Sequence, residues 1–458
     1  MKLRDNQISP VEKGVKFFKE KKPKPSIIVA PTAFGKSIVI AKIAKEINEK
    51  VLVIQPSKEL LEQNYAKFTR LGGKASIYSA SMGEKEIGDV TYATIGSIVN
   101  VAQDFVKYGI TKVMIDECDR YPREPSGMLR RFLRAANITH TLGLTATPLK
   151  LQNNLGRDGT PISKLVMLTS RSKKGTFFKK ILHVEQISNM VEKEYWSPLK
   201  YLSFDFDTDK LEYNSTGADF TAESMLQAYK ENDVHEKIKV AINKLIDRRG
   251  ILIAVPSIEE ARKLADDLPN AAAVYSEMPR SERIDIIDKF TSGEIRIVVQ
   301  VSILSVGFDY PELDCIIIAR PTASISWYYQ FIGRVTRIAE TKGDGIIVDF
   351  VGAVQRFGKV EDFYFKKEKR TWKLYGEGGK LLSGIPLREI GLHIEGEPSP
   401  YEELDNGKRV IMPFGKYKDK EIKFIPKYYR DWMMKNFNWN SSNKHIKEEI
   451  ERLAGIGL

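Results

Sequence analysis

A short loop at residues 30–37 combines the residue types that bind phosphate groups. Its sequence, A-P-T-A-F-G-K-S, follows an apolar strand-like run and opens a helix-like segment. Backbone N–H groups and a helix N-terminus can then surround phosphates, while the Lys36 ammonium reaches them and the Ser37 hydroxyl binds Mg²⁺. Ala30 stands where glycine is usual, and Phe34 where a small residue is usual. We predict a phosphate site rather than a structural turn. The residues expected to contact the phosphate-bearing ligand are Thr32, Ala33, Phe34, Gly35, Lys36 and Ser37.

Two carboxylates at the end of a predicted strand supply the complementary chemistry. Asp116 and Glu117 directly follow the apolar run 113–115. In open parallel sheets, the carboxyl ends of strands face the crevice where ligands bind. Asp116 would hold Mg²⁺ through water, and Glu117 would position and activate the attacking water. A solvated acidic turn is the alternative, but the upstream phosphate loop favours hydrolysis of ATP with Mg²⁺ as cofactor.

Alternating strand-like and helix-like segments must position these residues. Buried strands are predicted at 26–30, 51–55, 90–94, 112–116 and 141–145, and again at 250–255, 271–275, 295–300, 315–320 and 344–350. Helical segments fall between them, near 257–268, 279–291 and 324–333 in the second set. Strand and helix repeated in this way predict an α/β fold with two parallel sheets, each covered on both faces.

The alternation of strand-like and helix-like segments also predicts how the chain is divided into domains. The predicted parts are a first domain at 1–148, a connector at 149–200, a second domain at 201–352, a linker at 353–405 and a C-terminal module at 406–458. The linker is expected because a charge run at 366–370 is followed by loop-like glycines and prolines. The C-terminal module is basic and rich in aromatic residues.

Composition narrows the class of protein. The 458 residues carry a formal charge of +12, which favours polyanionic partners. No apolar run approaches the roughly 20 residues needed to cross a bilayer, and the first residues lack a secretion signal. Cys118 and Cys315 are far apart in strand-like runs, which argues against a disulfide framework or a zinc site. We expect a cytoplasmic protein that binds neither membrane nor zinc.

The motifs, taken in order, resemble those of superfamily 2 helicases. Beyond the phosphate loop and the D-E-C-D carboxylates, the matching segments are the Gln motif at 3–7, motif Ia at 56–63, Ib at 94–97, III at 143–148, V at 301–309 and VI at 330–337. Residues 307–314 and 320–337 look closest to bacterial RadD-like helicases and to phage branch-migration helicases of the T5 type. Gln330 and the D-E-C-D sequence differ from DEAD-box RNA helicases. The Cys-rich zinc module of RadD-like proteins is absent.

This resemblance implies two tandem RecA-like domains and a role for each motif residue. Gln7 would read adenine, Thr145 and Thr147 would couple nucleotide state to strand binding, and Gln330 would join the catalytic set. The other implied ATP contacts are Arg4, Gly307 and Asp309. The implied DNA contacts are Ser57, Lys58, Thr94, Gly96, Ser97 and Ser257, although Ser and Thr residues also cap helices.

Arg334 and Arg337 supply what the first domain lacks. They are three residues apart, on one face if helical, and follow Gln330 and Gly333. By resemblance they are arginine fingers that enter an interdomain ATP site, a contribution worth about 10³–10⁵ in turnover. Arginines on a helix surface would otherwise be the default interpretation.

Two further segments remain open. Phe177 and Phe178 lie among basic residues at 171–180, where packing is favoured over base stacking. Residues 409–418 resemble the M-P-F-G-K-Y-K module found beside some exonucleases and in small phage and bacterial proteins. That module either engages DNA or uses its aromatic residues as a core, because so small a unit needs its large side chains inside.

The leading hypothesis is an ATP-dependent DNA helicase or translocase that remodels forks and Holliday junctions in replication, recombination or repair. A recombination or nuclease protein is a possible partner. The alternatives are a motor subunit of a restriction or nuclease complex, an RNA helicase, and a nucleotide-gated scaffold. The scaffold is disfavoured because the catalytic candidates are all present.

Overall fold

A computed structural model provides the structure of the chain. It describes residues 3–121, 126–155, 161–169, 176–301, 310–369 and 371–390, then Met412, Ile422, Ile425, 427–436, Trp439 and 444–454. The chain forms two compact units, Met1–Glu395 and Gly396–Leu458. Gly307 and Asp309 of predicted motif V lie outside the described residues, as do residues 171–175 and most of 409–418.

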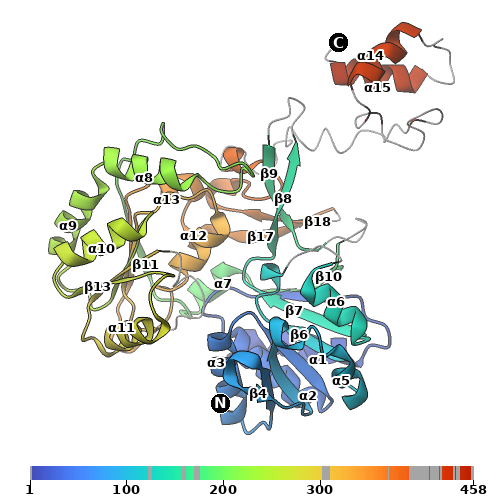
Figure 1. The fold of residues 1–458 in the computed structure, drawn as a ribbon, viewed down its shortest axis with the longest axis horizontal. Coiled ribbons are helices and arrows are strands. Elements are labelled where there is room, and N and C mark those ends of the chain that lie inside the picture. Colours follow the sequence, from blue (N-terminus) through green and yellow to red (C-terminus); the bar gives the residue numbers. More distant parts are fainter. Residues whose placement is uncertain are drawn as a thin grey trace. The chain divides into compact units, whose positions relative to one another are not determined.

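The first sheet of the larger unit has eight strands in the order β10-β1-β7-β6-β2-β5-β3-β4 (Figure 1). The strands are β1 (Ser26–Val29), β2 (Val51–Gln55), β3 (Ser76–Ser79), β4 (Glu84–Lys85), β5 (Val90–Thr94), β6 (Lys112–Ile115), β7 (His140–Thr145) and β10 (Lys180–Val184). The helices are α1 (Asp5–Lys19), α2 (Lys36–Ile47), α3 (Lys58–Arg70), α4 (Ile95–Ile98), α5 (Ala102–Tyr108) and α6 (Met128–Ala135). All pairs are parallel except β3 with β4.

Alternating strand residues build a core on each face of this sheet. Ile28 packs into one hydrophobic cluster, and Ile27 and Val29 pack into another. Every residue of β1, β2, β6 and β7 is buried. A sheet covered on both faces therefore has continuous apolar strands, which is why these strands stood out in the sequence.

The second sheet has six parallel strands in the order β11-β16-β15-β12-β14-β13. They are β11 (Leu199–Ser203), β12 (Ile251–Ala254), β13 (Ala271–Val274), β14 (Ile297–Gln300), β15 (Cys315–Ile318) and β16 (Gly345–Asp349). The helices are α8 (Ala222–Glu231), α9 (Val234–Lys244), α10 (Ile258–Asp267), α11 (Arg280–Ser292) and α12 (Ile325–Ile332). The predicted α/β class with two parallel sheets is confirmed, and the predicted strands match the observed ones closely.

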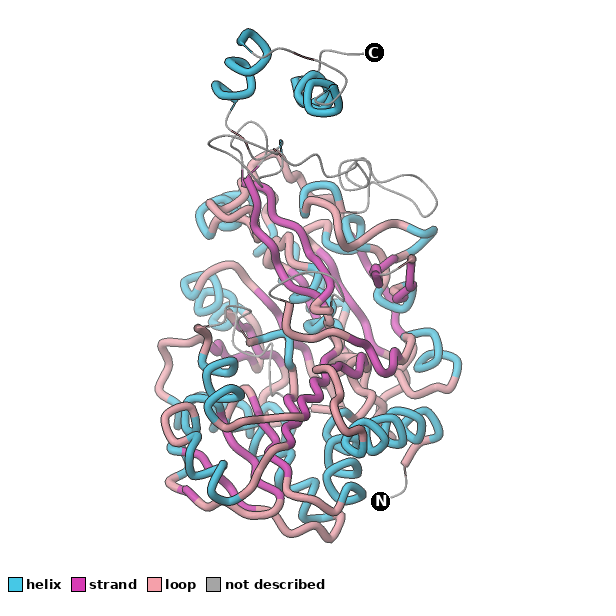
Figure 2. The backbone as a smooth tube through the Cα atoms, turned by 90° about the vertical axis from the view of Figure 1, so that its right-hand side faces the viewer, coloured by secondary structure: helices cyan, strands magenta, loops and turns pink. Residues whose placement is uncertain are grey.

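The segment predicted as a connector contributes to both sheets. Its first part forms an antiparallel hairpin of β8 (Leu149–Leu155) and β9 (Pro161–Met167), a long ribbon labelled in Figure 1 and magenta in Figure 2. Strand β10 then pairs with β1, helix α7 (Ile187–Glu192) follows, and β11 pairs with β16. An edge strand for each sheet thus lies within the segment expected to be a connector.

The predicted linker is wrong in its first part. Residues 353–390 contain α13 (Ala353–Phe357) and a hairpin of β17 (Tyr364–Glu368) and β18 (Thr371–Tyr375). Phe357, Phe363, Leu382 and Ile385 are buried in the main hydrophobic cluster. Residues 366–368 of the predicted charge run belong to β17, and their polar side chains concealed the apolar anchors on either side.

The smaller unit is described through α14 (Lys427–Asn436), α15 (Lys444–Ala454) and a few further residues. Its core consists of Met412, Ile422, Ile425, Met433, Ile446 and Ile450. Trp432 is 48% exposed and stacks on Tyr429 at 5.4 Å between ring centroids. Among the described residues of this unit, aliphatic and methionine side chains therefore form the core, and Trp432 does not.

The structure also describes Phe178, the two cysteines and the lengths of the helices. Phe178 is buried in the first-sheet core that also contains Phe132, as packing requires, and Arg130 lies 4.5 Å from the centroid of the Phe177 ring. Cys118 and Cys315 are buried free thiols. Among the described helices, none is both long and apolar enough to cross a membrane.

Candidate active site

The phosphate loop connects β1 to α2 through backbone that only a few residue types adopt readily. Gly35 has φ 88° and caps α2, and Ala33 has φ 57°. A Cβ on Gly35 would lie 2.7 Å from Gln7 Nε2, which donates to the Phe34 carbonyl at 2.6 Å. A glycine is therefore needed here, because φ is positive and because a side chain would clash with Gln7.

Two residues expected to touch the nucleotide occupy buried positions. Phe34 is completely buried in the hydrophobic core, which explains why an aromatic residue is tolerated in the loop. Gln7 is almost fully buried, and its Oε1 accepts from the Arg4 backbone N–H at 3.0 Å. Neither is among the described residues that line the adjoining cavity. Gln7 thus braces the phosphate loop from behind, and its contact with adenine stays a prediction.

A cavity of about 490 Å³ opens beside the loop, within the usual size range of small-molecule sites. Residues from both sheets line it. The predicted residues among them are Arg4, Thr32, Ala33, Gly35, Lys36, Ser37, Asp116, Glu117, Gln330, Arg334 and Arg337. Segments far apart in the sequence thus converge on one space.

Lys36 and Glu117 form an ion pair inside this cavity. Lys36 Nζ lies 3.1 Å from Glu117 Oε1. Burial opposes the charge on Lys36, but the carboxylates of Glu117 and Asp116 outweigh it and raise the pKa of Lys36. Glu117 adopts φ 44°, a left-handed backbone rare for such a residue and typical of strained functional positions. The lysine is held charged at the point where phosphates would enter.

Asp116 is a buried carboxylate in an electrostatically crowded position. Asn64 Nδ2 donates to Asp116 Oδ2 at 2.9 Å, and the Glu117 backbone N–H donates to Oδ1 at 3.0 Å. Burial, with the charge of Glu117, raises the pKa of Asp116 to about 6, although Lys36 opposes the shift. The Ser37 hydroxyl belongs to the same cavity. Carboxylate and hydroxyl oxygens fit Mg²⁺, whose charge would relieve the crowding.

Gly333 brings the second sheet's helix α12 against the phosphate loop. A Cβ on Gly333 would lie 2.5 Å from Thr32 Cγ2, and the Thr32 backbone N–H donates to Tyr329 Oη at 3.3 Å. Arg334 and Arg337 follow directly. Burial lowers the pKa of each to about 10, so both remain charged at neutral pH.

The predicted coupling threonines share one carboxylate. Thr145 Oγ1 donates to Asp119 Oδ1 at 2.5 Å, and Thr147 Oγ1 donates to Asp119 Oδ2 at 2.9 Å. Burial, with the charge of Glu117, raises the pKa of Asp119 to about 6. The end of β7 is thereby tied to the segment that carries Asp116 and Glu117.

The predicted DNA contacts lie where parallel strands end, outside the cavity. Ser57 and Ser257 cap α3 and α10, accepting from Leu60 N and Glu260 N. Their O–H groups can still donate, and both helices present N-terminal N–H groups, which suit phosphates. Thr94 Oγ1 and Ser97 Oγ are 2.9 Å apart, and Lys58 Nζ donates to Ser81 O at 3.1 Å. The backbone of Gly96 is open, because a Cβ on it would meet no described atom within 4 Å.

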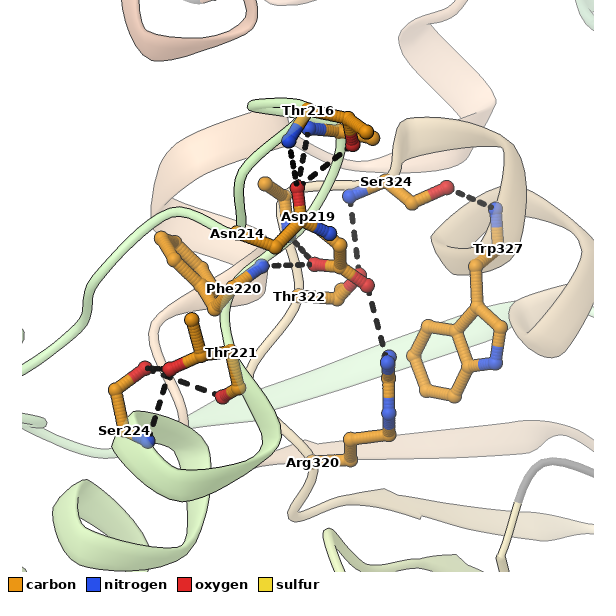
Figure 3. A network of polar contacts seen from close by, with 12 residues as sticks. Asn214, Thr216, Asp219, Phe220, Thr221, Ser224, Arg320, Thr322, Ser324 and Trp327 are labelled. Atoms are coloured by element: carbon orange, nitrogen blue, oxygen red, sulfur yellow. Dashed lines mark hydrogen bonds and ion pairs between the residues drawn. The ribbon is translucent and has the colours of Figure 1, made fainter.

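A polar network holds the start of α12 (Figure 3). Asp219 Oδ2 accepts from Arg320 Nη2 at 3.0 Å, and Asp219 Oδ1 accepts from the Ala323 backbone N–H at 2.6 Å. The hydroxyl of Thr322 lies 3.3 Å from both oxygens. Ser324 then caps α12 by accepting from Trp327 N. This network fixes the helix that leads to the two arginines.

Several cavity residues were not among the predicted site residues. The described lining also includes Gln63, Lys67, Arg120, Tyr195 and Ile338. Asn64 contacts Asp116 without lining the cavity. Gln63 ends predicted motif Ia, so its helix could have been extended by one residue to reach Asn64. Tyr195 lies in the predicted connector, where no local pattern points to a ligand.

Two families match separate parts of the chain. The family described as "Type III restriction enzyme, res subunit" matches residues 1–150, and "Helicase conserved C-terminal domain" matches residues 236–339. The first match contains Lys36 and Glu117, and the second contains Arg334 and Arg337. The two sides of the cavity therefore belong to two separately recognised regions.

Named relatives extend over most of the chain. The "Putative ATP-dependent helicase IRC3" of Saccharomyces cerevisiae is 24% identical, covering 77% of this chain and 52% of the relative. The "DNA 3'-5' translocase XPB2" of Sulfurisphaera tokodaii is 23% identical over 74% of this chain and 79% of the relative. This chain thus spans about half the length of the yeast protein.

Among solved structures, the chain is similar to an ATP-dependent Type ISP restriction-modification enzyme, LlaBIII, bound to DNA. The TM-score is 0.55 at 19% identity, covering 77% of this chain and 28% of that one. At this identity the likeness establishes the arrangement of two α/β domains alone.

Proposed function

We propose that this chain is a superfamily 2 helicase, an ATP-hydrolysing enzyme, and that it acts as a DNA translocase that remodels forks and Holliday junctions. The observation that carries the proposal is a single cavity lined by Lys36 and Glu117 from one region and by Arg334 and Arg337 from the other. Hydrolysis at a boundary between regions can drive their relative movement.

The hydrolytic step follows from the positions of the charged groups. Incoming phosphates compete with Glu117 for Lys36, whose ammonium moves from a carboxylate 3.1 Å away to the phosphate oxygens. Glu117 is then released to orient a water molecule and accept its proton. Arg334 and Arg337 offset the charge that develops on the transferred phosphoryl group. Ser37 and Asp116 would hold Mg²⁺, which supplies charge neutralisation between the terminal phosphates.

Coupling to movement is assigned to the threonines that share Asp119. Release of Glu117 alters the electrostatic surroundings of Asp119, whose oxygens accept from Thr145 and Thr147. These threonines lead directly into the β8–β9 hairpin. A change in nucleotide state thereby reaches an element outside the ATP site.

The nucleic-acid contacts are assigned to Ser57, Lys58, Thr94, Gly96, Ser97 and Ser257. Hydroxyls, an ammonium and backbone N–H groups bind phosphates without reading bases, so sequence-independent binding is expected. Within the superfamily we place the chain with RadD-like and T5-type phage branch-migration helicases, on the strength of residues 320–337. Replication, recombination or repair would supply its substrates, and a recombination protein is a candidate partner.

The test is ATP-dependent unwinding of matched substrates. The substrates, all of equal length, are single-stranded-tailed duplexes, forks, four-way junctions and DNA–RNA hybrids. Each is assayed at fixed salt, once with roughly 5 mM MgCl₂, as is standard for a Mg²⁺-dependent phosphoryl-transfer assay, and once with excess EDTA. Faster processing of forks and junctions, lost in EDTA, is expected. Preference for RNA-containing substrates would instead indicate an RNA helicase, and equal rates on all DNA substrates would remove the branched-DNA assignment.

A second candidate is the motor subunit of a restriction or nuclease complex. The match of residues 1–150 to a restriction-enzyme family favours it. Such a motor would act with a nuclease on another chain. Recovery of a stoichiometric nuclease with the native protein would support this candidate over a self-contained helicase.

A further inference from the structure

Three consecutive residues between α7 and β11, Tyr195, Trp196 and Ser197, contact both walls of the cavity. Tyr195 lines the cavity, while Trp196 and Ser197 are buried next to it. None belongs to a helicase motif identified in the sequence. Their contacts suggest a role in holding the nucleotide.

Tyr195 is paired with Arg4, which also lines the cavity. The Arg4 guanidinium carbon lies 4.7 Å from the centroid of the Tyr195 ring. Arg4 Nη1 also lies 3.4 Å from the Ala33 carbonyl of the phosphate loop. A planar cation on an aromatic face next to a phosphate loop is a surface on which a nucleobase can stack.

The Tyr195 hydroxyl is held from the other side. It donates to Asp5, which also pairs with Lys193. The Lys193 contact, followed by the Tyr195 hydroxyl, lowers the pKa of Asp5 to about 2. Asp5 therefore stays ionised at neutral pH and anchors the edge of the ring.

The next two residues fix the backbone of Tyr195. Trp196 Nε1 donates to the Thr32 carbonyl at 3.0 Å, which ties it to the phosphate loop. The Ser197 backbone N–H donates to the Thr336 carbonyl at 2.9 Å, and its hydroxyl donates to the Arg337 carbonyl at 2.7 Å. The ring is thus positioned by both walls of the cavity, as a preorganised binding surface requires.

We propose that Tyr195, with Arg4, forms the platform on which the nucleotide's base stacks. This inference rests on the proposed ATP site and adds its base-binding part, supplied by the segment between the two sheets. The aromatic face, rather than the hydroxyl, provides the affinity. Because every base has such a face, Tyr195 contributes to binding of nucleotides but not of inorganic phosphates.

Calorimetric titration with two probes separates this role from a structural one. ADP carries a base, and inorganic pyrophosphate does not. In Tyr195→Ala we expect ADP binding about ten-fold weaker, in the range of one base-stacking contact, and pyrophosphate binding within about two-fold of wild type. Tyr195→Phe keeps the ring and should bind ADP as the wild type does.

Tyr275→Ala is the matched control. Arg262 lies over the Tyr275 ring at 4.8 Å, a similar pair outside the cavity lining, and this variant should bind both probes normally. Equal weakening of ADP and pyrophosphate in Tyr195→Ala, unchanged ADP binding, or a loss in Tyr195→Phe equal to that in Tyr195→Ala would each overturn the proposal. Failure of the wild type to bind either probe would instead count against the ATP site itself.

Discussion

Gly333 lies so close to Thr32 that a Cβ on the glycine would fall 2.5 Å from Thr32 Cγ2. Gly333 directly precedes Arg334, in the part of the chain that forms the second sheet. Thr32 lies in the phosphate loop, in the part that forms the first sheet. Close approach at this point depends on the missing side chain, since the Gly333 backbone itself has ordinary helical dihedrals. The glycine therefore sets how near the segment that carries the arginines comes to the phosphate loop.

Replacing Gly333 with alanine should impair turnover more than folding. The added methyl group forces the phosphate loop and α12 apart, and a shift of about 1 Å in reacting groups can cost about 10² in rate. We expect ATP turnover to fall at least about ten-fold, with the melting temperature nearly unchanged because the two segments can separate. Steady-state kinetics and thermal unfolding measure the two effects.

Gly343→Ala provides the comparison for this substitution. A Cβ on Gly343 would meet no described atom within 4 Å, and its φ is not in the left-handed region. This variant should retain wild-type turnover. Turnover in Gly333→Ala equal to that in Gly343→Ala would show that contact at Thr32 does not limit catalysis.

Removing the two hydroxyls that share Asp119 should uncouple hydrolysis from strand movement. Valine at positions 145 and 147 keeps the shape of threonine but cannot donate to the Asp119 carboxylate. The double variant Thr145→Val, Thr147→Val should keep ATP turnover within several-fold and lose most strand displacement. Parallel measurement of both rates decides, with Thr139→Val as a control whose hydroxyl contacts Thr111 and His140. A proportional loss of both rates would argue against a coupling role.

Lys342 should make the free energy of unfolding depend on pH in the alkaline range. Burial lowers the pKa of Lys342 to about 8, while its ammonium donates to the carbonyls of Val335 and Arg337. Between about pH 8 and the unfolded value near 10.4, the unfolded chain binds more protons, so this group makes the free energy of unfolding rise with pH. Urea unfolding at pH 8 and pH 9.5 should show this rise in wild type relative to Lys342→Met. A constant difference between the two proteins would contradict the lowered pKa.

Deleting residues 405–458 should affect DNA more than ATP. The segment is basic, and its described part exposes Trp432 stacked on Tyr429. We expect weaker binding to four-way junctions, by about ten-fold, with basal ATP hydrolysis within about two-fold. Fluorescence anisotropy at two salt concentrations measures the loss and its electrostatic share. Unchanged junction affinity would remove the module from the DNA-binding surface.

The sequence predicted the sheets well because parallel strands covered on both faces are continuous apolar runs. Val51–Gln55 and Ile297–Gln300 needed only local information. The β8–β9 and β17–β18 hairpins were not predicted. Their strands mix polar and apolar residues, so these segments were interpreted as a connector and a linker. Their stability depends on packing against distant segments, which no local pattern encodes.

The candidate site was predictable to a similar extent. Lys36, Asp116 and Arg334 belong to motifs whose spacing indicates chemistry, and all three line one cavity. The adenine contact of Gln7 stays a prediction, and the motif could not show that its amide is bonded to the Phe34 carbonyl. Tyr195 was missed because its contacts with Arg4 and Asp5 join residues nearly two hundred positions apart.

The most direct test of the account is DNA-stimulated ATP hydrolysis by Lys36→Ala. In the proposed mechanism Glu117 holds the Lys36 ammonium until phosphates arrive, and without Lys36 both phosphate binding and the release of Glu117 would fail. Lys45, on the same helix, donates to the Leu71 carbonyl and supplies the control Lys45→Ala. We predict that turnover falls at least about 10²-fold in Lys36→Ala, comparable to the loss of one transition-state contact, and stays near wild type in Lys45→Ala. Turnover in Lys36→Ala close to the wild-type rate would contradict the account.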